Sequence, residues 1–293
     1  MQNKKLPAFI KIIAELMKYK VSLAVTFTTA IGYLVYAGSF DPKLLYAVVG
    51  VFLLSGGASA LNEIQERKYD QRMIRTRNRP IPSNRISPLN ALFIALVLIF
   101  SGSIFLLLTN NTSALYLGLF NIIWYNGVYT YLKRVTPFAV VPGSLTGAVP
   151  AFIGWTAAGG SLLDPKIILI GFFLFIWQVP HFWFLLLKYG KEYEEAGFPS
   201  ISTILPQQNL KFITYVWVIA TSITTLMFPL FHVLESGILY TMVFLLNIWL
   251  VITFTQLTFN MKIGINFKRT FATINIFMLI IMLLLAVEAI TLR

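Results

Sequence analysis

Nine apolar stretches dominate the 293-residue chain, and each is about as long as a helix that crosses a lipid bilayer. Only helices or closed barrels satisfy their backbone polar groups in lipid, and the alternation that marks a transmembrane barrel is absent from these stretches. The sequence therefore predicts an all-α polytopic membrane protein with nine transmembrane helices in a bundle. The helices are expected at residues 20–38, 43–64, 89–108, 114–132, 138–157, 166–187, 211–231, 237–259 and 270–290.

Composition supports this class of protein and excludes others. Charged residues make up 12% of the chain, about half their share in an average soluble domain. The chain has no cysteine, which rules out a disulfide, a thiolate metal site and a nucleophilic thiol. The net charge of +12 could indicate nucleic-acid binding, but in so apolar a chain basic residues that collect in cytoplasmic loops explain it better. Membrane lipid, and no nucleic acid, is the expected partner.

Lysine and arginine are distributed unevenly between the two sides of the predicted bundle. With a cytoplasmic N-terminus, 20 of the 23 basic residues lie on the cytoplasmic side, and only Lys43, Lys166 and Arg293 lie outside. This asymmetry is the positive-inside pattern of membrane proteins. It favours nine spans and an external C-terminus. The expected location is a bacterial-type inner (plasma) membrane.

The first 19 residues are expected to form an amphipathic cytoplasmic segment, and residues 20–293 a single transmembrane domain. Apolar side chains between Phe9 and Met17 recur at helical spacing, which is typical of a helix lying on a membrane surface. A frayed basic tail is the alternative. Two long cytoplasmic connections, about residues 65–88 and 188–210, each follow the second helix of a group of four, which indicates an internal four-helix repeat.

An oxygen-rich stripe is predicted where the second span reaches the cytoplasm. Asn62, Glu66 and Asp70 are spaced by four residues, so on a helix their side chains share one face. Carboxylates near lipid are costly and are usually held against a partner. Oxygen ligands suit a hard cation such as Mg²⁺, which commonly keeps water or phosphate oxygens as its remaining ligands. The stripe is therefore a candidate metal site.

Four arginines follow the stripe, at positions 72, 75, 77 and 79. Beside a bound metal, such a cluster suits a polyanion, and a diphosphate is the obvious candidate. The alternative is that the arginines only set the topology and form surface ion pairs. Stripe and cluster together, at the point where a helix leaves the bilayer, favour a ligand site.

These residues resemble the first signature of the UbiA-type membrane prenyltransferases. The matching pattern is Asn62-x3-Glu66-x3-Asp70-x2-Met73-x-Arg75-Thr76-x2-Arg79-Pro80. Further stretches are similar to the heme-modifying branch of that family. They are Tyr129-Thr130-x2-Lys133-Arg134-x-Thr136, Gly143-x3-Gly147-Ala148-x-Pro150-x3-Gly154-Trp155, Trp177-Gln178-x-Pro180-His181-Phe182-Trp183 and Tyr193-x2-Ala196-Gly197-x-Pro199. Glu66 stands where aspartate is usual, and the second acidic motif of quinone-making relatives is not intact.

The resemblance implies an enzyme that transfers farnesyl from farnesyl diphosphate to a vinyl group of heme B, giving heme O and diphosphate. It implies Mg²⁺ as the cofactor and heme B as a substrate, with heme A synthase or a terminal oxidase as a candidate protein partner. Asn62, Glu66 and Asp70 would hold the metal, and Tyr129 and Lys133 would complete the catalytic group. The residues expected to bind substrate are Arg75, Arg79, Arg134, Gln178, His181 and Glu192.

Three other functions stay open on the sequence alone. One is prenylation of an aromatic quinone precursor, and another is an inert assembly scaffold for an oxidase. The third is a membrane transporter, although transporters usually hold their polar site near the bilayer midplane rather than at one mouth. His181 also has two interpretations, as a ligand of heme iron or as a helix-end histidine hydrogen-bonded to a neighbour.

Overall fold

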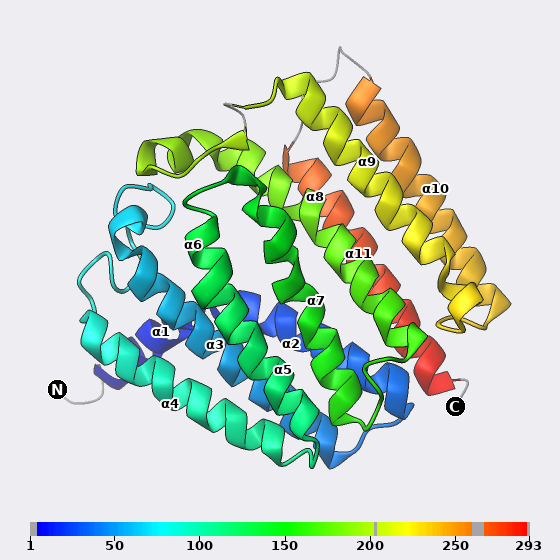
Figure 1. Ribbon diagram of the computed structural model, residues 1–293, viewed down its shortest axis with the longest axis horizontal. Helices are drawn as coiled ribbons and strands as arrows, with labels where there is room; N and C mark the ends of the chain where they lie inside the picture. The colour runs from blue at the N-terminus through cyan, green and yellow to red at the C-terminus, as the bar shows by residue number, and fades with distance from the viewer. Residues whose placement is uncertain (1–4, 202–203, 260–266, 292–293) are drawn as a thin grey trace.

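The computed structural model describes residues 5–201, 204–259 and 267–291, and every regular element among them is helical. Long helices pack into a bundle in which α4 forms one edge, and α9 and α10 lie side by side at the opposite edge (Figure 1). The α-helices are α1 (Lys5–Leu16), α2 (Tyr19–Ala37), α3 (Pro42–Asp70), α4 (Pro88–Leu107), α5 (Thr112–Ile122), α6 (Thr130–Leu132), α7 (Val140–Ala157), α8 (Pro165–Ala196), α9 (Gln207–Leu226), α10 (Gly237–Phe259) and α11 (Phe267–Thr291). A π-helix, η1 (Ile123–Tyr129), and two short 3₁₀ helices, η2 (Pro137–Ala139) and η4 (Phe228–Phe231), complete the set.

Seven of the described helical segments are long and apolar enough to cross a membrane. They comprise all or most of α2, α3, α4, α7, α8, α10 and α11. The other two expected spans also coincide with helix, because α5, η1 and α6 run continuously from residue 112 to 132, and α9 covers most of the seventh span. The prediction of an all-α membrane bundle is confirmed. The count of nine spans, the internal repeat and the domain limits stay predictions.

Three long helices begin at the same kind of sequence signal. Asp41, Ser87 and Asp164 precede a proline, and each side-chain oxygen accepts a hydrogen bond from a backbone N–H in the first turn of α3, α4 or α8. Such caps satisfy donors that have no partner inside the helix, and proline in the first turn loses no hydrogen bond. The start of each of these spans is therefore fixed locally.

Small residues let α2 and α7 approach closely. A Cβ atom added at Gly154 of α7 would lie 1.9 Å from the carbonyl oxygen of Thr29, and one added at Gly32 of α2 would lie 2.1 Å from that of Ala151. Close backbone packing of this kind holds membrane helices together where the lipid supplies no hydrophobic driving force. The contact places the two helices together in the centre of the bundle.

The C-terminal end of α1 is packed against the bundle. Leu16 is fully buried in a cluster with Ala60 of α3 and with Ile81 and Ile86 of the connection after α3. Glu15 forms an ion pair with Arg85 of the same connection at 2.5 Å. The connection over residues 71–87 therefore packs against both α1 and α3.

Buried Glu63, which lies outside the predicted stripe, also fixes this connection. Its Oε1 accepts a hydrogen bond from the backbone N–H of Ile81 at 2.9 Å. An isolated backbone N–H at a buried position would be costly. Glu63, which lies on the face of α3 next to the stripe, therefore holds the arginine-bearing connection (residues 71–87) in place.

Candidate functional site

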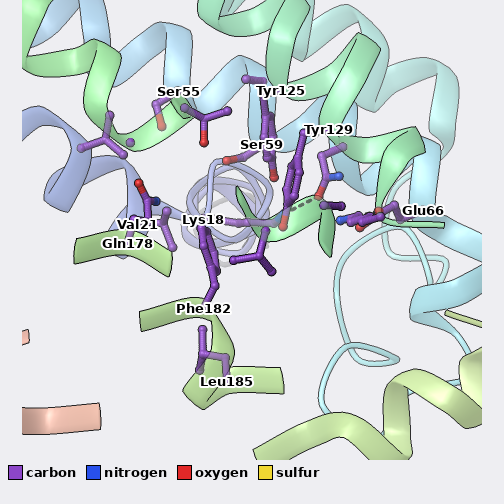
Figure 2. Close-up of a pocket in the computed structure, with 18 of the residues that line it drawn as sticks. Lys18, Val21, Ser55, Ser59, Glu66, Tyr125, Tyr129, Gln178, Phe182 and Leu185 are labelled. Atoms are coloured by element: carbon purple, nitrogen blue, oxygen red, sulfur yellow. Dashed lines mark hydrogen bonds and ion pairs between the residues drawn. The ribbon is translucent and has the colours of Figure 1, made fainter. Parts of the chain in front are cut away.

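A cavity of about 360 Å³ lies between α2, α3, the α5–η1–α6 helix, α7 and α8 (Figure 2). The stripe residues Asn62, Glu66 and Asp70 line its mouth at the end of α3. Mostly apolar side chains line the interior, among them Val25 of α2, Leu54 of α3 and Phe182 of α8, with a few small polar groups such as Ser55 and Ser59. The cavity thus joins a polar mouth to an apolar chamber.

Each side chain of the stripe contacts a basic residue from another part of the chain. Lys18 Nζ donates to Asn62 Oδ1 at 2.8 Å, Lys133 Nζ lies 2.5 Å from Glu66 Oε1, and Arg79 Nη1 donates to Asp70 Oδ2 at 2.8 Å. The three stripe side chains are only 1%, 5% and 1% exposed in chain order. Buried carboxylates need such partners, so three segments distant in sequence are held together here.

Lys18 belongs to this group, although the sequence marks it only as part of the N-terminal segment. It lies between α1 and α2 with φ 45° and ψ 51°, a left-handed backbone that turns its side chain into the cavity. Burial lowers the pKa of its amine to about 7, and the neighbouring positive charge of Arg79 adds to the effect. The only signal in the sequence is that Lys18 interrupts the apolar pattern between two helices.

The π-helix η1 carries two tyrosines into the cavity. The rings of Tyr125 and Tyr129 are stacked with centroids 5.9 Å apart, and Lys133 Nζ lies 5.4 Å from the centroid of Tyr129. In the view of Figure 2, Glu66 lies on one side of these rings and Gln178 on the other. Tyr129 was expected at the site, whereas Tyr125 was not. Wider turns of this kind often occur at functional sites.

Asn126 holds the π-helix against α3. Its Nδ2 donates to the carbonyl oxygen of Ala58 at 3.0 Å and to Oε1 of Gln65 at 3.1 Å. Gln65 returns a hydrogen bond from Nε2 to the carbonyl oxygen of Asn126 at 3.0 Å. This exchange fixes the rotation of the helix, so that its two tyrosines face the cavity.

Arg75 and Gln178, both expected to bind substrate, also line the cavity. Arg75 donates from Nη2 to the hydroxyl of Tyr193 at 3.2 Å. Gln178 Oε1 is buried and has no hydrogen-bond partner among the described residues. A Cβ atom at Gly147 would lie 1.9 Å from this oxygen, so glycine makes room for the carboxamide.

Three other expected substrate ligands do not line the cavity. Arg134 donates to the carbonyl oxygen of Gln65 at 2.9 Å, and its guanidinium lies over two tyrosine rings. Glu192 accepts a hydrogen bond from the backbone N–H of Arg75 at 3.3 Å. His181 Nδ1 contacts Asn275 Oδ1 at 2.8 Å. This placement favours the hydrogen-bonded interpretation of His181, and substrate binding by these three residues stays a prediction.

The oxygen donors of the stripe fit a magnesium ion. Glu66 and Asp70 supply two carboxylates beside the amide oxygen of Asn62, and Mg²⁺ is typically held by one or two carboxylates together with substrate phosphate oxygens. Among the described residues, no three His, Cys, Asp or Glu side chains form a metal-binding group. An ion at the stripe would therefore depend on oxygens from a bound ligand.

Comparison with known proteins gives consistent matches. The model of the family described as UbiA prenyltransferase matches residues 25–262. The protoheme IX farnesyltransferase of Oleidesulfovibrio alaskensis is 32% identical over 275 residues, which cover 94% of this chain and 95% of the relative. The enzyme of the same name from Legionella pneumophila (strain Paris) is 36% identical over 240 residues, with 80% of each chain covered.

Solved structures share the fold at low sequence identity. A digeranylgeranylglyceryl phosphate synthase superimposes with a TM-score of 0.79 at 17% identity, covering 96% of this chain and 98% of the other. A UbiA homolog from Archaeoglobus fulgidus, bound to GPP and Mg²⁺, gives a TM-score of 0.71 at 12% identity, with 96% and 99% covered. At such identities the likeness shows the fold alone.

Proposed function

Since the chain belongs to the UbiA prenyltransferase family, we propose that it transfers a farnesyl group from farnesyl diphosphate to a vinyl group of heme B, giving heme O and diphosphate. The observation that carries this proposal is the cavity, which joins a mouth of acidic and basic side chains to an apolar chamber beside two stacked tyrosines. Relatives named for farnesyl transfer to protoheme IX support heme as the acceptor.

The mouth of the cavity suits the diphosphate. Asn62, Glu66 and Asp70 would hold Mg²⁺, which neutralises negative charge on the leaving group. Arg79 and Lys133 contact the stripe and can donate hydrogen bonds to phosphate oxygens. Cationic donors already fixed around a developing negative charge lower the barrier to its formation. The mouth would thus bind the leaving group and stabilise its departure.

The apolar chamber suits the farnesyl chain. When the carbon–oxygen bond breaks, its electron pair leaves with diphosphate, and the allylic carbon becomes positive. The faces of Tyr125 and Tyr129 would stabilise this charge, and the apolar walls would keep water away from it. The vinyl electrons then form the new carbon–carbon bond, and water adds to the resulting cation with release of a proton.

The orientation and the product's destination form part of the same proposal. The helices make this an integral membrane protein, which we place in a bacterial inner membrane, and the excess of lysine and arginine supports a cytoplasmic N-terminus. The mouth of the cavity would then face the cytoplasm. Heme O is apolar, so we also propose its transfer within the membrane to heme A synthase or a terminal oxidase.

Mass spectrometry of extracted hemes tests the reaction directly. The purified protein in lipid, given heme B, farnesyl diphosphate and Mg²⁺, is expected to yield heme with the added mass of a farnesyl group plus a hydroxyl group. Prenylation of a hydroxybenzoate or naphthoate instead of heme would overturn the acceptor. Substrate flux into proteoliposomes without any product would favour a transporter.

Removal of divalent ions is expected to lower farnesyl transfer at least about a hundredfold, because the diphosphate would then leave without the charge neutralisation that a metal supplies. The measurement is the initial rate of heme O formation in EDTA, and again after Mg²⁺ is restored. Recovery on restoration excludes damage by the chelator. Undiminished transfer in EDTA would show that lysine and arginine suffice for the leaving group.

The variant Gly147→Ala is expected to lower kcat about tenfold, because the new methyl group would displace the carboxamide of Gln178 from the wall of the cavity. Gly127→Ala is the matched control, since a Cβ atom there meets nothing closer than 3.9 Å. The measurement is the rate of heme O formation at equal amounts of folded protein. Equal rates in the two variants would mean that the position of Gln178 does not matter for turnover.

A further inference from the structure

An open groove of about 330 Å³ adjoins the cavity on the side of the α1–α2 junction. One wall carries Lys18 from the junction and Lys20 from the first turn of α2, and the other carries Arg75 and Arg79 from the connection after α3. We call these four residues and the space between them the basic groove. Lys18, Arg75 and Arg79 also line the cavity, so the two spaces are continuous.

Positive charge in the basic groove is only partly neutralised. The one acidic residue that lines it, Glu15, is paired with Arg85, and Arg79 is paired with Asp70. Among the described residues no ion pair involves Lys18, Lys20 or Arg75. The side chains of Lys18 and Arg75 donate to neutral groups, the amide oxygen of Asn62 and the hydroxyl of Tyr193, while Glu192 accepts from the backbone N–H of Arg75. An anionic ligand would supply the missing countercharge.

Both walls of the basic groove are held by specific contacts. The junction is fixed by the burial of Leu16 and by the hydrogen bond from Ser22 Oγ to the carbonyl oxygen of Met17 at 2.8 Å. The opposite wall is fixed by buried Glu63, which binds the backbone N–H of Ile81. The spacing between the cations is therefore set by the fold, as a binding site requires.

The size of the cavity also indicates that a ligand extends into the basic groove. Pockets for drug-sized ligands measure about 300–1,000 Å³, so a cavity of about 360 Å³ is small for a farnesyl chain and a tetrapyrrole together. One substrate must extend beyond it. The farnesyl chain is apolar throughout and belongs inside, whereas the tetrapyrrole carries two carboxylates on one edge. The basic groove is the adjoining space whose charge matches that edge.

We propose that the basic groove binds the propionate carboxylates of the tetrapyrrole acceptor. Lys20 and Arg75, together with Lys18 at the border of the cavity, hold the carboxylate edge, and the rest of the macrocycle extends toward the cavity. This arrangement turns a vinyl group toward the farnesyl carbon beside Tyr125 and Tyr129. The inference rests on the proposed function and adds how the acceptor is recognised and oriented.

The test combines Lys20→Met with heme B and its dimethyl ester, which lacks the negative charges. Lys20 lines the groove but not the cavity, so the variant spares the diphosphate site. With heme B, its KM for the acceptor is expected to rise about fivefold, the effect of one partly exposed charge pair. With the diester, variant and wild type are expected to have equal KM values. The KM for farnesyl diphosphate stays unchanged in both cases.

Lys11→Met is the matched control, because Lys11 is an exposed lysine of α1 that does not line the groove. It is expected to behave as wild type with both acceptors. Spectroscopic titration of heme B without farnesyl diphosphate should show the same fivefold weakening in Lys20→Met. This binding measurement does not depend on turnover.

Other outcomes would overturn the inference. An equal rise in KM for heme B and the diester would show that Lys20 acts without the carboxylates, and a rise for farnesyl diphosphate would assign the groove to the other substrate. An effect seen only in bilayers with anionic lipid would assign it to lipid headgroups. Wild-type protein that forms no farnesylated heme, yet binds heme through Lys20, would refute the proposed function and leave carboxylate binding in place.

Discussion

Asp70→Asn is expected to lower farnesyl transfer about a thousandfold while the protein still folds and inserts. Asp70 is 1% exposed and pairs with Arg79 at 2.8 Å, so asparagine keeps its shape but leaves Arg79 without a countercharge. The variant also removes one of the two carboxylates proposed to hold the metal. Both changes weaken the stabilisation of the departing diphosphate. Initial rates of heme O formation and the elution profile of the purified protein measure the two halves of this prediction.

Glu195→Gln provides the comparison for Asp70→Asn. Glu195 is an exposed carboxylate near the end of α8, so its neutralisation is expected to leave the rate within twofold, about the scatter of a surface substitution. Asp70→Glu, which restores the charge with a longer side chain, should recover part of the activity. If Asp70→Asn remained within tenfold of wild type, the anchor for diphosphate would have to lie elsewhere.

Gly154→Ala is expected to destabilise the bundle by about 3 kcal/mol, at the upper end of the usual cost of overpacking. The added carbon would lie 1.9 Å from the carbonyl oxygen of Thr29, a backbone atom that can move only if α2 and α7 separate. An apparent Tm about 5–10 °C lower is expected for a chain of this size. The measurement is thermal unfolding in detergent, followed by the loss of monodisperse protein on heating.

Gly237→Ala is the matched control for this prediction. A Cβ atom at Gly237 meets nothing within 4 Å, so the same substitution should leave the apparent Tm unchanged. Should Gly154→Ala prove as stable as this control, α2 and α7 would not depend on their close backbone contact. A loss of activity without a loss of stability would instead place the effect in the cavity.

The helical framework could be predicted from the sequence because apolar length and helical periodicity are local properties. Each of the nine expected spans overlaps a described helix. The four-residue spacing of the stripe was enough to predict that Asn62, Glu66 and Asp70 line a common site, and all three line the cavity. The C-terminal end of α8 was harder to predict. The helix continues past the predicted end at residue 187 to Ala196, because its hydrogen bonds persist outside the apolar segment until Gly197 adopts φ 95°.

The remaining parts of the site depend on tertiary contacts that no local pattern encodes. Lys18 reaches the stripe only because α1 is packed against α3 and one residue adopts a left-handed backbone. Tyr125 faces the cavity through a π-helix, whose register a 3.6-residue period does not predict. Arg134 and His181 lie in motifs typical of the family, yet neighbouring segments determine where their side chains point.

Lys18, Arg79 and Lys133 already occupy oxygens of the stripe. A divalent ion arriving alone must compete with these side chains for the oxygens, whereas a bound diphosphate would accept hydrogen bonds from the same side chains and release the oxygens. Diphosphate should therefore tighten the binding of the metal, and the two should bind with positive cooperativity. Because such coupling is reciprocal, saturating one ligand should tighten the other by the same factor.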